Sequence, residues 1–340
     1  MRTFGWVAVV LGLFGLGGPA SATTPEQVRV MIVTAFADEA GVWERARPFA
    51  RAIPVPGLAD EYPTVKCGAD QVCLVTTGMG HANAAASIAA LVFSNRFDLH
   101  RTWWVVTGIG GINPKEGTLG SAAWADWLVS WGLQWELDAR ERPAGWPSGY
   151  TGLFTRGPEE KPRLDYGTEL YRLDPRLVQR AYALSRNVTL ADSDAAKETR
   201  ALYPPPASRP PSVIRCDTAS GDTWFSGRHL GERAEAWTRL LTDGKGRYCT
   251  TQQEDNAILA ALVRGDTAGL LDVKRVAVLR TGADFDRPAP GGSAADNLLN
   301  FAAQGGFAPA LANLVHAAAP LVDEIAQHWP AWRDGVPEGP

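Results

Sequence analysis

Residues 105–114 read VVTGIGGINP, an apolar run followed by three glycines within four residues. A short apolar run without alternation predicts a strand that is covered on both faces. Closely spaced glycines let bare backbone approach a ligand that a β-carbon would exclude. We therefore expect a buried strand that leads into a ligand-binding turn, with ordinary turn chemistry as the alternative.

Three further segments carry glycine at the end of an apolar run. They are residues 78–81 (GMGH), 220–225 (SGDTWF) and 280–284 (RTGAD). In α/β sheets, ligands bind beyond the ends of the strands. Four glycine-bearing strand ends therefore predict one shared site.

The rest of the chain alternates between predicted strands and helices. We expect strands at residues 28–35, 71–76, 103–108, 121–129, 214–219 and 276–281. We expect helices at residues 38–50, 82–93, 174–185, 257–263, 295–304 and 308–328. This alternation predicts an α/β sheet with covering helices.

The first 22 residues have the composition of a secretory signal peptide. Arg2 provides a positive start, residues 7–16 an apolar core, and residues 20–22 (ASA) a cleavage signature. The apolar core is shorter than the roughly 20 residues that a membrane-spanning helix needs, and no later apolar segment has that length. We therefore expect an exported chain, periplasmic or secreted, with no membrane span after signal cleavage. An uncleaved signal anchor is the alternative.

Residues 23–340 are expected to form a single domain. At ~100–200 residues per domain, this length is compatible with one large domain or with two. Prolines and glycines accumulate around residues 141–211, which predicts a long surface excursion that shapes or covers the site. A linker between two domains is the alternative.

The composition limits the classes of partner. The formal net charge is −4, and the chain has no run of lysine or arginine. Both features argue against binding to a phosphate backbone, so we expect no nucleic-acid partner. Hydrophobic residues make up 45% of the chain, which is enough to bury a sizeable core.

The expected export of the chain decides how its four cysteines are interpreted. An oxidising compartment favours two disulfides over a metal site, and we expect the pairs Cys67–Cys73 and Cys216–Cys249. The first pair brackets a predicted hairpin turn. We expect no zinc, because the spacing lacks two close pairs and no histidine lies nearby. Buried unpaired thiols are the alternative, since the sequence alone does not fix connectivity.

The ordered series of motifs resembles that of the nucleoside phosphorylase superfamily. After the stretch at 108–114 come residues 119–121 (LGS), 220–222 (SGD), 254–257 (EDNA) and 282–284 (GAD). The closer match, over most of the mature chain, is to the purine nucleoside permease family, whose members resemble those phosphorylases in fold. The resemblance implies a three-layer α/β/α fold with a central mixed sheet, a purine nucleoside as ligand, no cofactor, and assembly as a homo-oligomer.

The same resemblance implies two catalytic carboxyl groups. Asp284 aligns with the aspartate that protonates or hydrogen-bonds the five-ring nitrogen of the purine as the glycosidic bond breaks. Glu39 aligns with the glutamate that activates water in the related nucleosidases. The alternatives are structural: Asp284 and Asp286 can cap a loop, and Glu39 can complement the dipole at the start of a helix.

The nucleoside-binding residues follow partly from the resemblance and partly from chemistry. A purine needs an aromatic slot, which Trp224 and Phe225 can form, although paired aromatics on a strand are often core. Glu254 matches the glutamate that accepts hydrogen bonds from ribose hydroxyls, with dipole complementarity as its alternative role. The full expected set is Gly108, Ile109, Gly110, Trp224, Phe225, Gln253, Glu254, His81 and Asn83.

These expectations favour an exported enzyme that cleaves the N-glycosidic bond of purine nucleosides. Water is preferred over phosphate as the nucleophile, because Val106 and Ile109 stand where the phosphorylases carry an arginine and a hydroxyl residue. A phosphate-dependent phosphorylase, with phosphate as a second partner, is one alternative. The other is a non-catalytic protein that binds nucleosides and supports their uptake.

Overall fold

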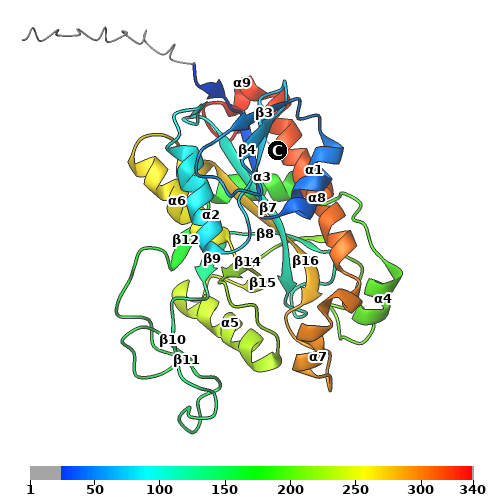
Figure 1. Cartoon of the computed structure of the whole chain (residues 1–340). Helices are drawn as coiled ribbons and strands as arrows, with labels where there is room; N and C mark the ends of the chain where they lie inside the picture. Colours follow the sequence, from blue (N-terminus) through cyan, green and yellow to red (C-terminus); the bar gives the residue numbers. More distant parts are fainter. Residues whose placement is uncertain (1–23, 339–340) are drawn as a thin grey trace, which may run out of the picture.

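The computed structural model describes residues 24–338, so the predicted signal segment, residues 1–22, lies outside the described residues. A 12-stranded mixed sheet runs through the molecule and is covered by helices on both faces (Figure 1). This arrangement confirms the predicted α/β/α layers. Within the described residues, no helix is both long enough and apolar enough to cross a membrane.

The centre of the sheet consists of buried strands that pair in parallel. β2 (Val30–Thr34) lies between β5 (Val72–Thr76) and β7 (Trp103–Ile112), and β7 also pairs with β16 (Val276–Phe285). Every residue of β2, β5 and β16 is buried. Their apolar runs lack alternation because helices cover both faces of these strands.

The remaining strands extend the sheet on both sides and make it mixed. The principal order is β12-β9-β14-β15-β7-β2-β5-β4-β3, with β8 and β13 attached through β16. β15 runs antiparallel to the end of β7, whereas β14 is parallel to both of its neighbours. The bounds are β3 (Arg51–Pro54), β4 (Thr64–Cys67), β8 (Ala122–Trp124), β9 (Trp127–Ser130), β12 (Leu170–Arg172), β13 (Val213–Arg215), β14 (Asp217–Ser220) and β15 (Tyr248–Gln252).

The helices form the two outer layers. α2 (His81–Val92) packs against α6 (Asp255–Thr267) on one face of the sheet, and α8 (Phe307–Gln327) packs against α1 (Ala37–Ala46) and α3 (Pro175–Ser185) on the other (Figure 1). α5 (Arg228–Leu241) packs against β14 and β15. The shorter helices are α4 (Asp194–Arg200), η1 (Val273–Arg275), α7 (Ala294–Leu299), η2 (Phe301–Gln304) and α9 (Trp329–Trp332).

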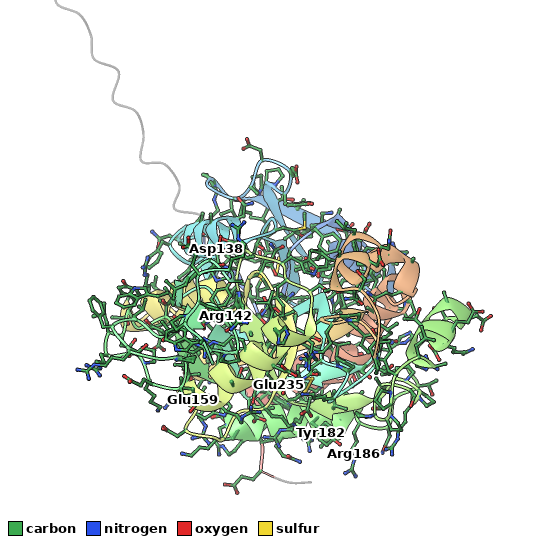
Figure 2. All side chains as sticks on the ribbon, turned by 90° about the horizontal axis from the view of Figure 1, so that it is seen from below. Asp138, Arg142, Glu159, Tyr182, Arg186 and Glu235 are labelled. Atoms are coloured by element: carbon green, nitrogen blue, oxygen red, sulfur yellow. A yellow bond between two sulfur atoms is a disulfide. The ribbon has the colours of Figure 1, made fainter. Side chains whose placement is uncertain are left out.

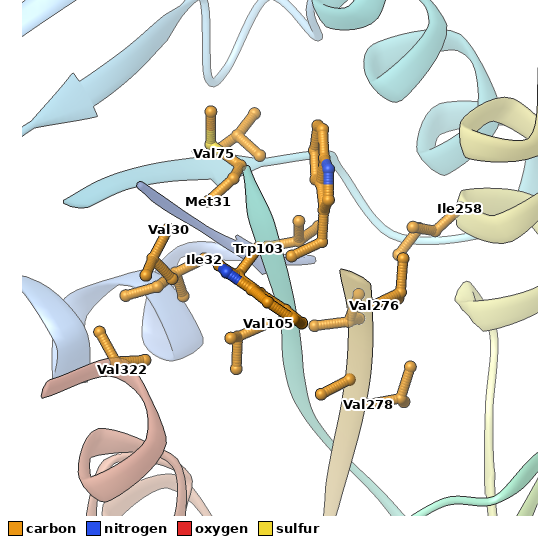
Figure 3. Close-up of a cluster of buried hydrophobic side chains, with 14 of the residues drawn as sticks. Val30, Met31, Ile32, Val75, Trp103, Val105, Ile258, Val276, Val278 and Val322 are labelled. Carbon is orange, nitrogen blue, oxygen red and sulfur yellow. The ribbon is translucent and has the colours of Figure 1, made fainter. Parts of the chain in front are cut away.

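The main hydrophobic core joins the strands to both helix layers. Figure 3 shows side chains of β2, β7 and β16 at its centre, with Ile258 of α6 and Val322 of α8 among the residues that surround them. Trp103 is fully buried there, and its ring meets that of Trp332 edge to face at 5.1 Å. Burial of each such large side chain contributes roughly 1.5–3 kcal/mol, so this core fixes the central strands whose ends carry the site.

Several element boundaries differ from the prediction. The strand expected at 214–219 is two strands, β13 and β14, and the helix expected at 295–304 is divided at Asn300 into α7 and η2. The strand expected at 103–108 continues to Ile112, because β16 pairs along nearly all of β7 and β15 pairs with its glycine-bearing end. The single strand expected at 121–129 is two strands, β8 and β9, which break at Ala125–Asp126. The chain changes partner there, from β16 to β14.

The proline- and glycine-rich excursion is only partly a surface feature. β12 forms an edge of the sheet by pairing with β9, and Leu177, Val178 and Ala181 of α3 belong to the main core. Between β9 and β12, a small hairpin of β10 (Trp135–Glu136) and β11 (Tyr150–Thr151) lies outside the main sheet. Charged side chains cover this hairpin region, including Asp138, Arg142 and Glu159 (Figure 2).

A second two-stranded pair joins β1 (Glu26–Gln27) to β6 (Phe97–Asp98).

Both predicted disulfides are present. Cys67 and Cys73 are direct cross-strand partners in the antiparallel pair β4 and β5, and they are disulfide-bonded. Cys216 and Cys249 are bonded across the starts of the neighbouring strands β14 and β15. The second disulfide therefore links two strands whose opposite ends contribute to the candidate site.

Candidate functional site

A cavity of about 250 Å³ lies where five strands of the sheet end. Its wall includes residues at or just after the ends of β2, β7, β14, β15 and β16. Parallel strands whose carboxyl ends meet leave a crevice of this kind, and ligands of α/β proteins bind there. The shared site predicted from the glycine-bearing strand ends therefore exists as a cavity.

One side of the cavity is aromatic and apolar. Phe36, Met79, Trp224, Phe301 and Phe307 line it. The Trp224 side chain is 46% exposed, and its ring packs on Phe301 with the centroids 5.0 Å apart. Such a wall suits a flat ring, because aromatic faces stack on π-systems while excluding water.

The expected slot between Trp224 and Phe225 is not formed. Phe225 is buried and does not line the cavity; its ring packs against Trp131 at a centroid distance of 4.7 Å. Adjacent side chains on an extended segment point in opposite directions, so one of the pair enters the core. Phe301 takes the place that Phe225 was expected to fill.

Glu39 is buried at the floor of the cavity. It follows β2 in the first turn of α1, where its carboxylate accepts hydrogen bonds from the backbone N–H of Ala35 at 2.7 Å and of Ile109 at 2.8 Å. Burial raises the pKa of Glu39 to about 7, although Arg280 and the two amides favour the charged form. A carboxyl group with this pKa can act as a base near neutral pH.

Arg280 of β16 gathers three carboxyl groups around one buried guanidinium. Its Nη2 lies 2.6 Å from Asp255 Oδ1 and 3.4 Å from Glu254 Oε2, and its charge also acts on Glu39. Burial alone would lower the pKa of Arg280, but Asp255 and Glu254 outweigh burial and raise it. The arginine is therefore already matched by acidic partners.

Asp284 lies at the end of β16 and faces the cavity with little exposed area. It is 3% exposed, and its Oδ2 lies 3.6 Å from the position that a Cβ on Gly111 would occupy. Burial raises the pKa of Asp284 to about 7, the charge of Asp286 adds to this shift, and Trp224 opposes it. A carboxyl group that holds its proton near neutral pH can donate it to a bound ligand.

A second buried ionic cluster stands behind Asp284. The Arg287 guanidinium donates to Asp286 at 2.7 and 2.9 Å and to Glu235 at 2.8 Å, and the Tyr248 hydroxyl donates to Asp286 at 2.9 Å. Arg287 also packs on Gly231, where an added Cβ would lie 2.3 Å from its Nη2. Asn113 and Lys115 also donate to Glu235, and none of the residues of this cluster lines the cavity.

Glu254 and Gln253 lie where β15 gives way to α6. Glu254 accepts a hydrogen bond from the Gly80 backbone N–H at 3.1 Å, which ties the start of α2 to this wall. The Gln253 amide donates to the Asp222 carbonyl at 2.7 Å. Both side chains line the cavity and present polar atoms toward a ligand.

His81 and Asn83 lie outside the wall of this cavity. The Asn83 side chain turns back along α2 and donates to the Met79 carbonyl at 2.9 Å. His81 donates its backbone N–H to Asp222 at 2.7 Å, and its ring lines a neighbouring cavity. The motif at 78–81 contributes Met79 to the site, because the glycine turn directs the helix away from it.

The three glycines of β7 do different things. Gly110 and Gly111 line the cavity with Ile109, as expected for a ligand approach. Gly110 also leaves room for the antiparallel strand β15, because a Cβ there would lie 2.4 Å from the Thr251 carbonyl oxygen. Gly108 is not in the wall: a Cβ there would meet Arg280 Nη1 at 2.1 Å. Gly108 therefore accommodates Arg280 rather than a ligand.

Some cavity residues carried little or no sequence signal. Arg280 was singled out as part of the glycine-bearing strand end at 280–284, and its pairing with Asp255 was not anticipated. Phe36, Phe301 and Phe307 come from three separate segments, and only the folded chain brings them together. An arginine inside an otherwise apolar strand, as in residues 276–285, is the one pattern that pointed to a buried ion pair.

The chain matches a protein-family model described as purine nucleoside permease (NUP) over residues 27–337. A probable purine nucleoside permease of Schizosaccharomyces pombe is 40% identical, with 96% of each chain covered. A purine nucleoside permease of Candida albicans is 36% identical over 89% of this chain and 76% of its own length.

Solved structures with the same fold include two 5′-methylthioadenosine/S-adenosylhomocysteine nucleosidases. The Neisseria meningitidis protein has a TM-score of 0.52 at 14% identity, covering 87% of this chain and 99% of its own. The Helicobacter pylori protein has a TM-score of 0.53 at 12% identity, with the same coverage. These structures confirm the nucleoside phosphorylase-like fold, and on the family model and the fungal relatives together, this chain belongs to the purine nucleoside permease family.

Proposed function

We propose that the cavity binds a purine nucleoside and that Glu39 and Asp284 hydrolyse its N-glycosidic bond. One observation carries the proposal: two buried carboxyl groups, from opposite ends of the chain, line a single cavity that also has an aromatic wall. Glycosidic hydrolysis needs such a pair, one group to protonate the leaving group and one to activate water. The fungal relatives are named purine nucleoside permeases, and the fold is shared with nucleosidases; both support a purine nucleoside as the ligand.

Asp284 supplies the acid. As the bond between C1′ and the purine nitrogen breaks, its electron pair moves into the base, and the Asp284 carboxyl transfers its proton to the five-ring nitrogen. A purine anion is a poor leaving group, and a well-placed acid typically accelerates such a step by ~10²–10⁴-fold. Because burial raises the pKa of Asp284 to about 7, a substantial fraction of the chains holds this proton at neutral pH.

Glu39 supplies the base. Its carboxylate takes a proton from water, the water oxygen bonds to C1′, and the products are the free base and ribose. The amides of Ala35 and Ile109 hold this carboxylate in place. Solvent then returns the proton to Asp284 and removes the one on Glu39. Glu254, on the neighbouring wall, accepts hydrogen bonds from the ribose hydroxyls.

The charge of the site favours water over phosphate as the nucleophile. A phosphate dianion needs cationic partners, and Arg280 is the one cation among the described residues that line the cavity. Asp255 and Glu254 already pair with Arg280, and Glu39 lies beside it. A phosphate there would meet more negative than positive charge.

The test is product analysis with the purified mature chain. Adenosine, guanosine and inosine are incubated with and without phosphate, and the free base, ribose and ribose phosphate are measured. Free ribose at a rate independent of phosphate is the expected result. Ribose phosphate that forms only with phosphate present would replace hydrolysis by phosphorolysis.

A second candidate function is nucleoside capture that supports uptake, which the name permease of the family and its relatives favours. It needs the aromatic wall and Glu254 but not proton transfer by Glu39 and Asp284. Tight nucleoside binding without any product would support it. In either function we propose an exported chain, since two disulfides suit an oxidising compartment.

A further inference from the structure

A second, larger cavity of about 550 Å³ adjoins the first. It lies between the starts of α2 and α6, the carboxyl ends of β9 and β14, and the β10–β11 hairpin. Its volume falls within the ~300–1,000 Å³ range typical of small-molecule pockets. None of the steps proposed for the first cavity uses it.

Small residues on two helices keep this cavity open. Ala82 and Ala85 of α2 and Ala257 and Ala260 of α6 line it where the two helices approach each other. Longer side chains at these four positions would project into the cavity. Alanine also leaves this part of the wall apolar.

An aromatic pair forms the opposite wall. Trp131 is 3% exposed, and its ring is held between Tyr150 at 5.1 Å and Phe225 at 4.7 Å. Trp131 and Tyr150 both line the cavity. Packing on Trp131 fixes the ring of Tyr150, which is only partly buried and offers a preformed surface for stacking a flat molecule.

The polar groups of the wall are two carboxylates, His81, the amides of Gln134 and Asn256, and the hydroxyls of Ser130, Thr168 and Thr223. Asp222 and Glu136 contribute carboxylates, and no lysine or arginine of residues 24–338 contributes to the wall. The Nδ1 of His81 is buried and has no hydrogen-bond partner among those residues; Asp222 Oδ1 lies 3.5 Å away. Carboxylates without cations favour N–H and O–H donors and repel phosphate.

The alanines, the aromatic residues and the carboxylates that line this second cavity together indicate its ligand. We infer that the cavity binds a neutral, planar nitrogen heterocycle that carries N–H or O–H donors. A purine base and its nucleoside share this chemistry. The ring stacks on Tyr150, which Trp131 holds in place, and its donors reach Asp222 and Glu136. The inference goes beyond the proposed cleavage and does not depend on it.

The two sites share a wall. Gly221 and Thr223 line both cavities, and Asp222 between them binds α2 through the His81 N–H and the first cavity through Gln253. A molecule in the second cavity therefore contacts the segment that carries Trp224. Binding at one site is expected to change the affinity of the other.

The experiment counts bound ligand by equilibrium dialysis. The Asp284→Asn chain is used so that adenosine is not consumed, with adenine, adenosine and adenosine monophosphate as separate probes. Ala85→Leu fills the second cavity, and Ala86→Leu is the matched control, because Ala86 is exposed on the same helix and lines neither cavity. Far-UV circular dichroism checks that both variants are folded.

We expect two molecules of adenine or adenosine per chain, falling to one with Ala85→Leu and remaining at two with Ala86→Leu. The probe whose count falls identifies the ligand as free base or nucleoside. The monophosphate is expected to leave the second site empty. A count of one before any substitution at Ala85, or a count unchanged by Ala85→Leu, overturns the inference.

Failure of the proposed cleavage gives a different pattern. In chains that retain Asp284, Ala86→Leu is expected to hydrolyse adenosine as the unsubstituted chain does. If neither releases the base while the second binding event is still lost in Ala85→Leu, the cleavage proposal fails and the second site stands.

Discussion

Asp284 and Asp286 lie two residues apart at the end of β16, and both are almost fully buried, with 3% and 1% exposure. Asp286 is bound by the Arg287 guanidinium through both oxygens and by the Tyr248 hydroxyl. Asp284 forms no ion pair with any of the described residues and faces a cavity. Two carboxyl groups with nearly equal burial thus differ in their partners: a cation binds one and not the other.

The comparison shows that a cationic partner, and not the degree of burial, distinguishes a carboxylate that stabilises the fold from one that can transfer a proton. Burial raises the pKa of both groups, but Arg287 and Tyr248 oppose the shift at Asp286. The Asp286 cluster is satisfied internally and holds β16 to α5 through Glu235. Asp284 lacks a cation and can keep a proton for a ligand, the combination expected of a functional residue.

The largest expected effect is on turnover. Asp284→Asn keeps the shape of the side chain but cannot transfer a proton, so adenosine hydrolysis is expected to fall ~10²–10⁴-fold while nucleoside affinity changes little. Steady-state kinetics and equilibrium binding measure the two quantities. Turnover that survives Asp284→Asn would remove Asp284 from the mechanism.

The neighbouring substitution should instead damage stability. Asp286→Asn leaves the buried Arg287 with Glu235 as its remaining carboxylate partner, and breaking a buried pair costs up to ~3–5 kcal/mol. Denaturant unfolding of the two single variants compares them directly. At about pH 5, where Asp284 holds its proton, Asp284→Asn is expected to unfold at about the concentration required for the unsubstituted chain. Equal destabilisation by both variants would erase the distinction.

The pH dependence of stability sharpens the contrast. The folded pKa of Asp284 is about 7 and lies above the unfolded value, so its stabilising contribution is complete below the unfolded pKa and is lost as pH rises through about 7. Asp284→Asn lacks this loss. We expect its Tm relative to that of the unsubstituted chain to increase between about pH 5 and about pH 8; a constant difference contradicts the shifted pKa.

The smallest effect concerns the aromatic wall. Trp224 lines the cavity whereas its neighbour Phe225 packs on Trp131. Trp224→Leu removes a stacking contact worth ~0.5–1.5 kcal/mol, so nucleoside Kd should rise ~2–10-fold with little change in Tm. Phe225→Leu should lower Tm and leave Kd nearly unchanged. The reverse pattern would return Phe225 to the binding site.

The sequence predicted the parts of the molecule that are local in the chain. Apolar runs identified β2, β5, β7 and β16, since strands covered on both faces need no alternation. The spacing of Cys67 and Cys73 predicted a disulfide across a hairpin, which the structure contains. The helix α5 was not expected, although Ala234, Trp237 and Thr238 recur at helical spacing and are buried.

The site was harder to predict because it depends on direction and pairing. Sequence motifs placed Glu39, Asp284 and Glu254 at strand ends, and all three line the cavity. They did not reveal that Phe225 turns inward or that Gly108 accommodates Arg280. Such features follow from which face of a strand meets the core, and one residue of register reverses them.

The protonation state of Asp284 tests the central claim most directly. Infrared difference spectra between the unsubstituted chain and Asp284→Asn, recorded at about pH 6, isolate the carboxyl group of this residue because a protonated carboxyl and a carboxylate absorb at different frequencies. We predict a carboxylic-acid carbonyl band that is lost in Asp284→Asn and titrates away as pH rises through about 7. A carboxylate band at that pH, with no acid band, would contradict the account of Asp284 as the proton donor.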